Sequence, residues 1–192
     1  MSSWPKLMVL IVYILSSVSA AKRGKTKSIN VYEDCQSGDK IVKYLGSTLT
    51  YSVFLGKNHP KPLECHYEFE MYNENFKRSY GFHVYIEDMY LRNGDHIQFG
   101  KDSFSGVIEQ RSPKYSGNKS NLSYFEREDF EFDLWIKIKD TSYNPKMNLT
   151  ITIFKKNCNK DERKSNWRNC PNQNFCINED FFCDGYHNCP NG

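Results

Sequence analysis

The five histidines are the side chains of this sequence best suited to proton transfer near neutral pH, so their settings decide whether catalysis is expected. Nucleophilic catalysis needs a Ser or Cys beside a His that a carboxylate orients. The sequence has no Gly-x-Ser-x-Gly turn, no His-Glu-x-x-His pair and no Gly-rich phosphate loop before Lys-Ser or Lys-Thr. His66 and His83 share the outward parity of their expected strands, which favours ordinary solvent-facing histidines. We therefore expect no enzyme.

The N-terminal residues indicate the compartment in which the cysteines must be interpreted. Lys6 precedes an unbroken apolar run from Leu7 to Leu15, and small residues follow, a pattern typical of a secretory signal peptide. We predict residues 1–20 to be that peptide, with cleavage after Ala20 or Ala21. A nine-residue run is far short of the roughly 20 residues that cross a bilayer, and no later stretch approaches that length. The mature chain is therefore expected to be secreted or extracellular, with no membrane span in this chain.

Seven cysteines in such a compartment are expected to form disulfides rather than metal-thiolate or redox sites. Cys35 and Cys65 lie alone in the front two thirds of the chain. The last 35 residues hold the other five: Cys158, Cys170, Cys176, Cys183 and Cys189. This asymmetry predicts a boundary between a front domain with its own core and a small tail that disulfides must stabilise.

Three Asn-x-Ser/Thr sequons begin at Asn118, Asn121 and Asn148, and each is a candidate N-glycosylation site of a secreted protein. The first two overlap in a segment, residues 111–123, that is rich in Ser, Gly, Asn and Lys. We interpret that segment as a solvated loop in which double occupancy is not expected. An unused sequon is the alternative at each position, because a three-residue pattern is common by chance.

The charge of the chain excludes one class of partner. The sequence has 26 basic and 23 acidic side chains and a net charge of +3, which gives no field strong enough to favour nucleic acid. A local basic cluster comprises Lys22, Arg23, Lys25 and Lys27. We interpret residues 21–30 as a flexible basic mature N-terminus rather than a heparin or nucleic-acid site.

The elements that must position these residues have a two-residue hydrophobic period between Cys35 and Cys158. Phe82, Val84 and Ile86 alternate with outward residues in one stretch, and similar alternation runs through residues 49–55, 66–71, 134–139 and 149–153. An Asn-Gly pair at 93–94 and an Asn-Pro pair at 144–145 fall where turns are expected. Short strands, turn signals and no helical stripe predict an all-β fold, an antiparallel β-sandwich with a small disulfide-stapled C-terminal module.

A series of motifs in the front domain resembles the CUB family over about residues 31–157. A first Cys at the first strand is followed 30 positions later by Cys65, which opens Cys-His-Tyr-Glu-Phe. Residues 81–91 (Gly-Phe-His-Val-Tyr-Ile-Glu-Asp-Met-Tyr-Leu) and 95–100 (Asp-His-Ile-Gln-Phe-Gly) complete the resemblance. The second disulfide usual in CUB domains has no counterpart in this sequence. The resemblance implies a CUB-like sandwich that recognises other proteins, with a disulfide between Cys35 and Cys65.

The CUB resemblance also implies a calcium site. Many CUB domains hold calcium between a Glu, an Asp eight residues later and an Asp in a later loop, and Glu87, Asp95 and Asp140 fall at those positions. Three converging carboxylates would repel one another, whereas Ca²⁺ takes their oxygens readily. Three unrelated surface acids are the alternative. In this family such carboxylates face a basic side chain of the partner, so the resemblance implies an extracellular protein presenting Lys or Arg.

The tail is similar to an LDL-receptor class A module, over residues 158–192. Residues 170–177 read Cys-Pro-Asn-Gln-Asn-Phe-Cys-Ile, and residues 183–189 read Cys-Asp-Gly-Tyr-His-Asn-Cys. The family pairing implies disulfides Cys158–Cys176 and Cys170–Cys189, and it leaves Cys183 without a partner in this chain. As the alternative, Cys158 belongs to the end of the sandwich.

A calcium site in the tail is not expected. Asp184 and the carbonyls of Phe181 and Tyr186 match ligand positions of the module, but Asn188 replaces the second acid. Calcium takes about six to eight oxygens, which this tail does not supply. We therefore expect a disordered or incompletely folded tail, and we interpret the chain as a fragment, an isoform or an incomplete gene model of a longer protein.

The function that these patterns favour is extracellular protein binding, with calcium-assisted ligand recognition by the CUB-like domain. One alternative is the regulatory N-terminal part of an extracellular protease whose catalytic domain follows. Another is the ectodomain fragment of a single-pass receptor or auxiliary subunit, and a third is a small secreted toxin or salivary component.

Overall fold

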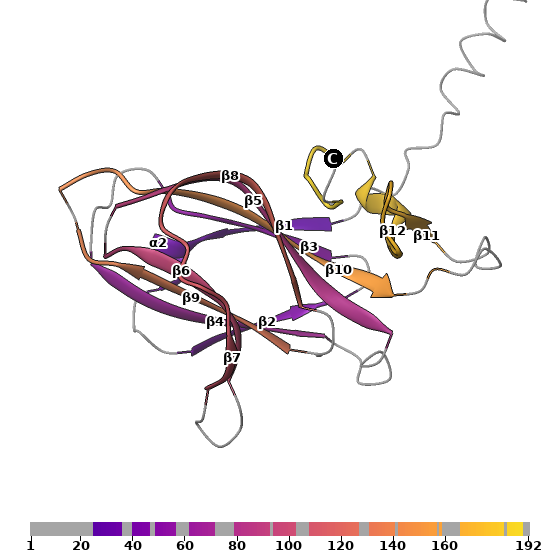
Figure 1. The fold of residues 1–192 in the computed structure, drawn as a ribbon, viewed down its shortest axis with the longest axis horizontal. Coiled ribbons are helices and arrows are strands. Elements are labelled where there is room, and N and C mark those ends of the chain that lie inside the picture. The colour runs from indigo at the N-terminus through magenta and orange to yellow at the C-terminus, as the bar shows by residue number, and fades with distance from the viewer. Residues whose placement is uncertain are drawn as a thin grey trace, which may run out of the picture.

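Two β-sheets pack face to face in the structure, a computed structural model (Figure 1). It describes residues 25–35, 40–46, 49–56, 62–71, 79–92, 94–102, 108–126, 131–140, 142–156, 158, 166–182 and 184–189. The predicted signal peptide and Cys183 lie outside these residues. None of the helices in the described ranges is long and apolar enough to cross a membrane.

The larger sheet is built around β10 (Lys146–Lys156), which pairs with β5 (Tyr80–Leu91) along one edge and β3 (Leu49–Phe54) along the other. β8 (Gly117–Glu126) pairs with β5, and β1 (Lys25–Asn30) pairs with β3. Past the end of β3, β12 (Phe175–Asn178) pairs with the last residues of β10, and β11 (Trp167–Asn169) pairs with β12. The tail therefore continues the sheet of the front domain.

The smaller sheet has the order β2 (Lys40–Leu45), β4 (Leu63–Met71), β9 (Glu131–Ile138), β6 (His96–Asp102) and β7 (Ile108–Arg111). A four-residue helix, α2 (Val31–Asp34), follows β1, and a 3-10 turn, η3 (Glu179–Phe181), follows β12. The smaller sheet lies below the larger one in Figure 1, and the tail lies on the opposite side of the molecule.

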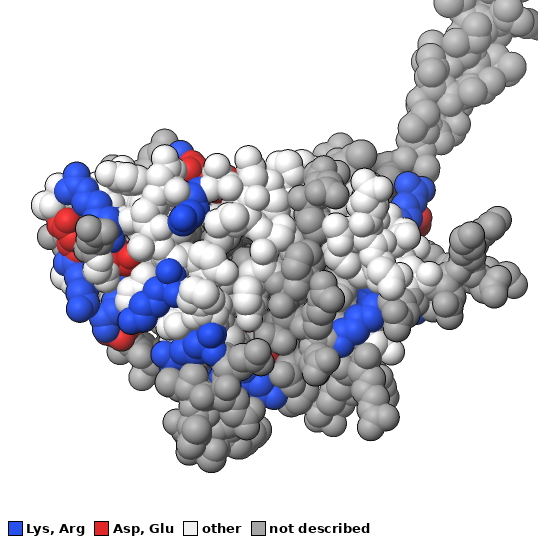
Figure 2. Space-filling model, viewed as in Figure 1, with Lys and Arg blue, Asp and Glu red and all other residues white. Residues whose placement is uncertain are grey.

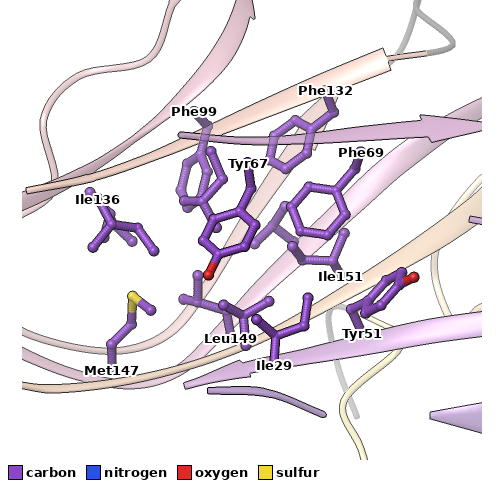
Figure 3. Close-up of a cluster of buried hydrophobic side chains, with 14 of the residues drawn as sticks. Ile29, Tyr51, Tyr67, Phe69, Phe99, Phe132, Ile136, Met147, Leu149 and Ile151 are labelled. Carbon is purple, nitrogen blue, oxygen red and sulfur yellow. The ribbon is translucent and has the colours of Figure 1, made fainter. Parts of the chain in front are cut away.

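The core lies between the sheets because each strand turns alternate apolar side chains inward. Tyr67 and Phe69 of β4 and Phe132 of β9 face Tyr51 of β3 and Ile151 of β10 (Figure 3). All five are buried, and ring contacts join Phe69 to both Tyr51 and Phe132. These contacts make the sandwich a rigid support for the side chains on its two outer faces.

The five predicted strand regions are confirmed as parts of β3, β4, β5, β9 and β10, and the all-β sandwich is confirmed with them. The sheets are mixed rather than wholly antiparallel, because β1 pairs with β3 and β2 pairs with β4 in parallel.

Two segments differ from the prediction. The basic N-terminus was expected to be flexible, but residues 25–30 form β1, because Ile29 enters the core while Lys25 and Lys27 stay exposed. The expected loop at 111–123 contains most of β8, which pairs only with β5 among the described strands. Its outer edge faces solvent, and this exposure explains a strand rich in Asn, Ser and Lys.

Candidate functional site

Asp95, the central residue of the expected calcium site, is fully buried and bonded to the chain itself. Its Oδ1 accepts hydrogen bonds from the backbone N–H groups of Lys139 (2.6 Å) and Asp140 (3.2 Å). Its Oδ2 accepts one from the hydroxyl of Tyr143 (2.6 Å). Burial, and then this bond to Asp95, raise the pKa of Tyr143, so the tyrosine remains a donor. Asp95 fastens the end of β9 to the start of β6.

Glu87 and Asp140, the other two expected ligands, also have partners within the chain. Glu87 accepts hydrogen bonds from the side chains of Asn148 and Thr150 (3.0 Å), both on β10. Asp140 accepts bonds from the N–H (2.8 Å) and the hydroxyl (2.6 Å) of Ser142. These bonds, with the guanidinium of Arg92 3.8 Å away, lower the pKa of Asp140.

The three carboxylates do not fit a calcium ion in this arrangement. Among the residues that the structure describes, no group of three or more His, Cys, Asp or Glu side chains is placed to hold a metal ion. In this structure Asp95 is bonded to Tyr143 and Glu87 is bonded to Thr150 of β10. The calcium ion stays a prediction from the resemblance.

The cysteines form the three disulfides that the two resemblances imply: Cys35–Cys65, Cys158–Cys176 and Cys170–Cys189. Cys35 follows α2 and Cys65 lies in β4, so the first disulfide joins the end of α2 to the smaller sheet. The other two bonds stabilise the tail around Phe175, Ile177 and Phe181, which form a small buried cluster with Phe154 of β10. Disulfides of this density are typical of extracellular proteins.

The tail is folded onto the larger sheet, contrary to the expectation of disorder. Asn188 forms the contact between the tail and the sheet, which we call the joint. This side chain is buried, and its Oδ1 accepts a hydrogen bond from the hydroxyl of Thr152 on β10 (2.6 Å). Its Nδ2 donates to Asp184 Oδ1 (3.0 Å) and to the carbonyls of Phe181 (3.0 Å) and Tyr186 (3.3 Å). Those three oxygens belong to the residues that the module resemblance marked as ligands. The amide nitrogen of Asn188 therefore occupies the position that a calcium ion would take between these three oxygens.

His83, expected to face solvent, is fully buried under the tail. It does point outward from β5, but its Nδ1 lies 3.0 Å from the carbonyl oxygen of Asn188 and its Nε2 lies 3.2 Å from the hydroxyl of Ser123. Burial lowers the pKa of His83 to about 4, against a smaller raising effect from the Asn188 carbonyl. The imidazole is therefore neutral at physiological pH and serves the joint.

The predicted sequons all lie on the larger sheet. Asn118 and Asn121 are exposed on β8, and Asn121 accepts a hydrogen bond from Tyr85 (2.9 Å). Asn148, on β10, is half-buried against Glu87. Glycans on these residues would leave the outer face of the smaller sheet uncovered.

A groove of about 530 Å³ opens on that outer face. The strand registers place two rows side by side across β4, β9 and β6: His66, Trp135 and Gln98 in one, and Glu64, Lys137 and His96 in the other. The remaining lining residues are Cys65, Ile136, Lys139, Arg111 and Lys114. We call this set the sheet groove.

Stacked planar groups form the centre of the sheet groove. The ring of Trp135 lies 5.0 Å from that of His66, nearly parallel to it, and 4.1 Å from the guanidinium carbon of Arg111. His66 Nε2 is 2.5 Å from Oδ1 of the buried Asp133, and Gln98 donates to the carbonyl of Ser112 (2.8 Å). Each planar side chain is thus fixed by a neighbour.

The sheet groove has a strongly basic lining. Its described lining residues include four Lys and Arg side chains and one acid, Glu64, which pairs with Lys137 (2.6 Å). The pKa of His96 is lowered by burial and also by the charges of Lys114, Lys137 and Lys139. Basic side chains gather where Figure 1 places β6 and β9, with few acidic ones between them (Figure 2).

Sequence reasoning missed both the sheet groove and the role of Asn188. The alternation that predicted β9 already put Trp135, Lys137 and Lys139 on one outward face, which was the available signal. Arg111 and Lys114 join them only through the pairing of β6 with β7 and the bridge from Ile97 to Tyr115, which a single sequence does not show.

No family model and no curated protein matches the chain. Among solved structures, it is similar to the CUB1-EGF-CUB2 domains of rat MASP-1, with a TM-score of 0.41 and 16% identity, covering 60% of this chain and 40% of that one. A MASP-1 CUB2 domain bound to Ca²⁺ matches with a TM-score of 0.41 and 16% identity over 60% of this chain and 98% of that one. The human MASP-1/3 CUB1-EGF-CUB2 domain matches with a TM-score of 0.41 and 13% identity, covering 61% and 42%. The chain thus spans 40% of the length of the first of these structures.

Proposed function

We propose that this chain is an extracellular recognition module that binds an anionic partner protein through the sheet groove. The observation that carries the proposal is the groove itself, a concave surface of about 530 Å³ with four basic side chains around a stacked centre. A rigid sandwich that presents such a surface suits recognition of a complementary charge pattern. Three disulfides support an extracellular location.

Charge decides which partner is favoured. A partner presenting Lys or Arg, as the CUB resemblance implies, would need exposed carboxylates, and Asp95 is fully buried. That partner and the calcium-assisted contact stay predictions, and no step of the proposed recognition passes through the ion. The sheet groove instead offers Arg111, Lys114 and Lys139 to an anion. The same role would serve a secreted protein, the regulatory part of a protease or a receptor ectodomain.

Two charge-reversal variants of the full chain test this function. In the groove variant, Lys114→Glu and Lys139→Glu act on two exposed residues that form no ion pair with any residue in the described ranges. In the control variant, Lys25→Glu and Lys119→Glu make the same change of net charge on β1 and β8 of the larger sheet. The measurement is binding of the purified, labelled chain to intact cells and to their secreted matrix.

We expect the groove variant to lose most of this binding while the control variant keeps it, since only the first changes the sign of the recognition surface. Equal binding by the two variants would contradict the proposed function. Circular dichroism of both variants shows whether they share the fold of the unmodified chain.

A further inference from the structure

The sheet groove lacks the feature that usually anchors a protein partner. Protein interfaces concentrate their binding energy in exposed aromatic or aliphatic side chains that enter pockets. Among the described residues that line the groove, the apolar side chains apart from disulfide-bonded Cys65 are Trp135 and Ile136. Ile136 is fully buried in the core, and Trp135 is stacked against His66 and Arg111. The groove thus favours a ligand that binds by charge and hydrogen bonds.

The cations of the groove are spaced for a chain of repeated anions. Lys137 lies near the end of β9, and Lys139 follows just after its last residue, Ile138; both line the groove. Lys114 follows β7, on the other side of β6 from β9, and Arg111 lies over the ring of Trp135. Glu64 partly neutralises Lys137, so Lys114, Lys139 and Arg111 carry most of the attraction.

We propose that the sheet groove binds sulfate groups of a sulfated polysaccharide chain carried by the extracellular partner. This inference rests on the proposed function, and it names the chemistry of the anion. Sulfate groups keep their charge at every physiological pH and accept hydrogen bonds from guanidinium and ammonium groups on several oxygens. A polysaccharide also supplies them at intervals along an extended chain, which matches cations that lie at the end of β7 and just after it, and at the end of β9 and just after it. Carboxylate groups of an acidic protein segment are the competing source of negative charge.

The accessible side of the molecule fits this ligand. The tail packs on the larger sheet around His83, which is buried against Asn188, and the three sequons lie on that sheet as well. The outer face of the smaller sheet carries neither. A long polysaccharide can therefore lie along the groove without meeting the tail or glycans attached at those sequons.

Heparin is the probe for the test, with the full chain and the groove and control variants defined above. We expect the unmodified chain and the control variant to bind heparin, with affinity falling as salt rises. The groove variant should bind about tenfold or more weakly, because two ammonium contacts are lost and reversed. Equal weakening in both variants would show nonspecific attraction to a cationic chain and would overturn the proposal.

Competition distinguishes the source of the anion. Chemically desulfated heparin and polyglutamate keep carboxylates without sulfate, and neither should displace the chain from immobilised heparin at concentrations where heparin does. Enzymatic removal of sulfated polysaccharides from cells should abolish groove-dependent binding. If that treatment changes nothing while the groove variant still fails to bind cells, the sulfate assignment is overturned and the proposed function stands. If the groove variant binds cells normally, the proposed function fails too.

Discussion

At the scale of single residues, the buried carboxylate of Asp95 shows how a polar side chain holds parts of the chain together. Asp95 lies at the position that the CUB resemblance gives to a calcium ligand, yet three donors of the chain satisfy its two oxygens. Through these hydrogen bonds the buried carboxylate stabilises the segment that follows β9. The hydrogen bonds give Asp95 a structural role, and calcium binding at this position stays a prediction.

Replacing Asp95 by Asn tests that role. Asp95→Asn replaces one acceptor oxygen by an amide NH₂ group. The N–H groups of Lys139 and Asp140, or the hydroxyl of Tyr143, then face another donor and lose their acceptor. We expect the free energy of unfolding to fall by about 3 kcal/mol, measured by urea denaturation. For the unmodified chain, melting temperatures in millimolar calcium and in chelator should coincide. A calcium-dependent rise that Asp95→Asn removes would contradict the structural role and restore the ion site.

At the scale of elements, Asn188 connects the tail to the larger sheet. Its amide satisfies three oxygens of the tail and its carbonyl oxygen reaches β10. Asp184 Oδ2 is buried, and no hydrogen-bond donor in the described ranges reaches it. Burial raises the pKa of Asp184 accordingly. The oxygens of Asp184, Phe181 and Tyr186 form a cage of the kind that binds cations, but the amide of Asn188 fills it.

The substitution Asn188→Asp should convert this cage into a calcium-dependent one. It replaces the donor by an oxygen that faces Asp184, so we expect a loss of about 3 kcal/mol in chelator. Millimolar calcium should restore part of the loss, because the ion takes the oxygens that the amide held. The matched control, Asn188→Ala, should lose similar stability with no recovery. Recovery of both variants, or of neither, in calorimetric melts would count against the cage.

His83 should make the joint between tail and sheet sensitive to acid. Its folded pKa is about 4 and its ordinary value is 6.5, so the unfolded chain binds more protons between those values. The free energy of unfolding therefore falls as pH falls below 6.5, by about 2 kcal/mol at pH 5 for this residue alone. Urea titrations at pH 7 and pH 5 measure the difference, which His83→Gln should largely remove. An unchanged difference in that variant would assign the effect to other groups.

The strands that the sequence predicted are those with a strict two-residue period, such as residues 82–87 within β5. β1 and β8 were missed because one has a single core side chain, Ile29, and the other is an edge strand rich in polar residues. The predicted outward direction of His83 was correct, but its predicted exposure was not, because its burial depends on Asn188, 105 residues later in the chain. Local periodicity gives the face on which a side chain lies and cannot show what covers that face.

At the scale of the whole molecule, the two outer faces of the sandwich have different roles. The tail packs on part of the larger sheet, around His83 and Thr152, and the smaller sheet presents the sheet groove. One face therefore contributes stability and the other is free for recognition. Glycosylation at the predicted sequons would affect the first face and leave binding at the second unchanged.

The most direct test of the recognition face is an NMR titration of the isotope-labelled full chain with a short heparin oligosaccharide. We predict that chemical-shift changes concentrate at Gln98, Trp135 and Lys137 and at the neighbouring amides of β4, β6 and β9. The amides around Asn188 and those of β1 should not move. Changes centred on the tail or on the N-terminal lysines, with the groove amides unaffected, would contradict it.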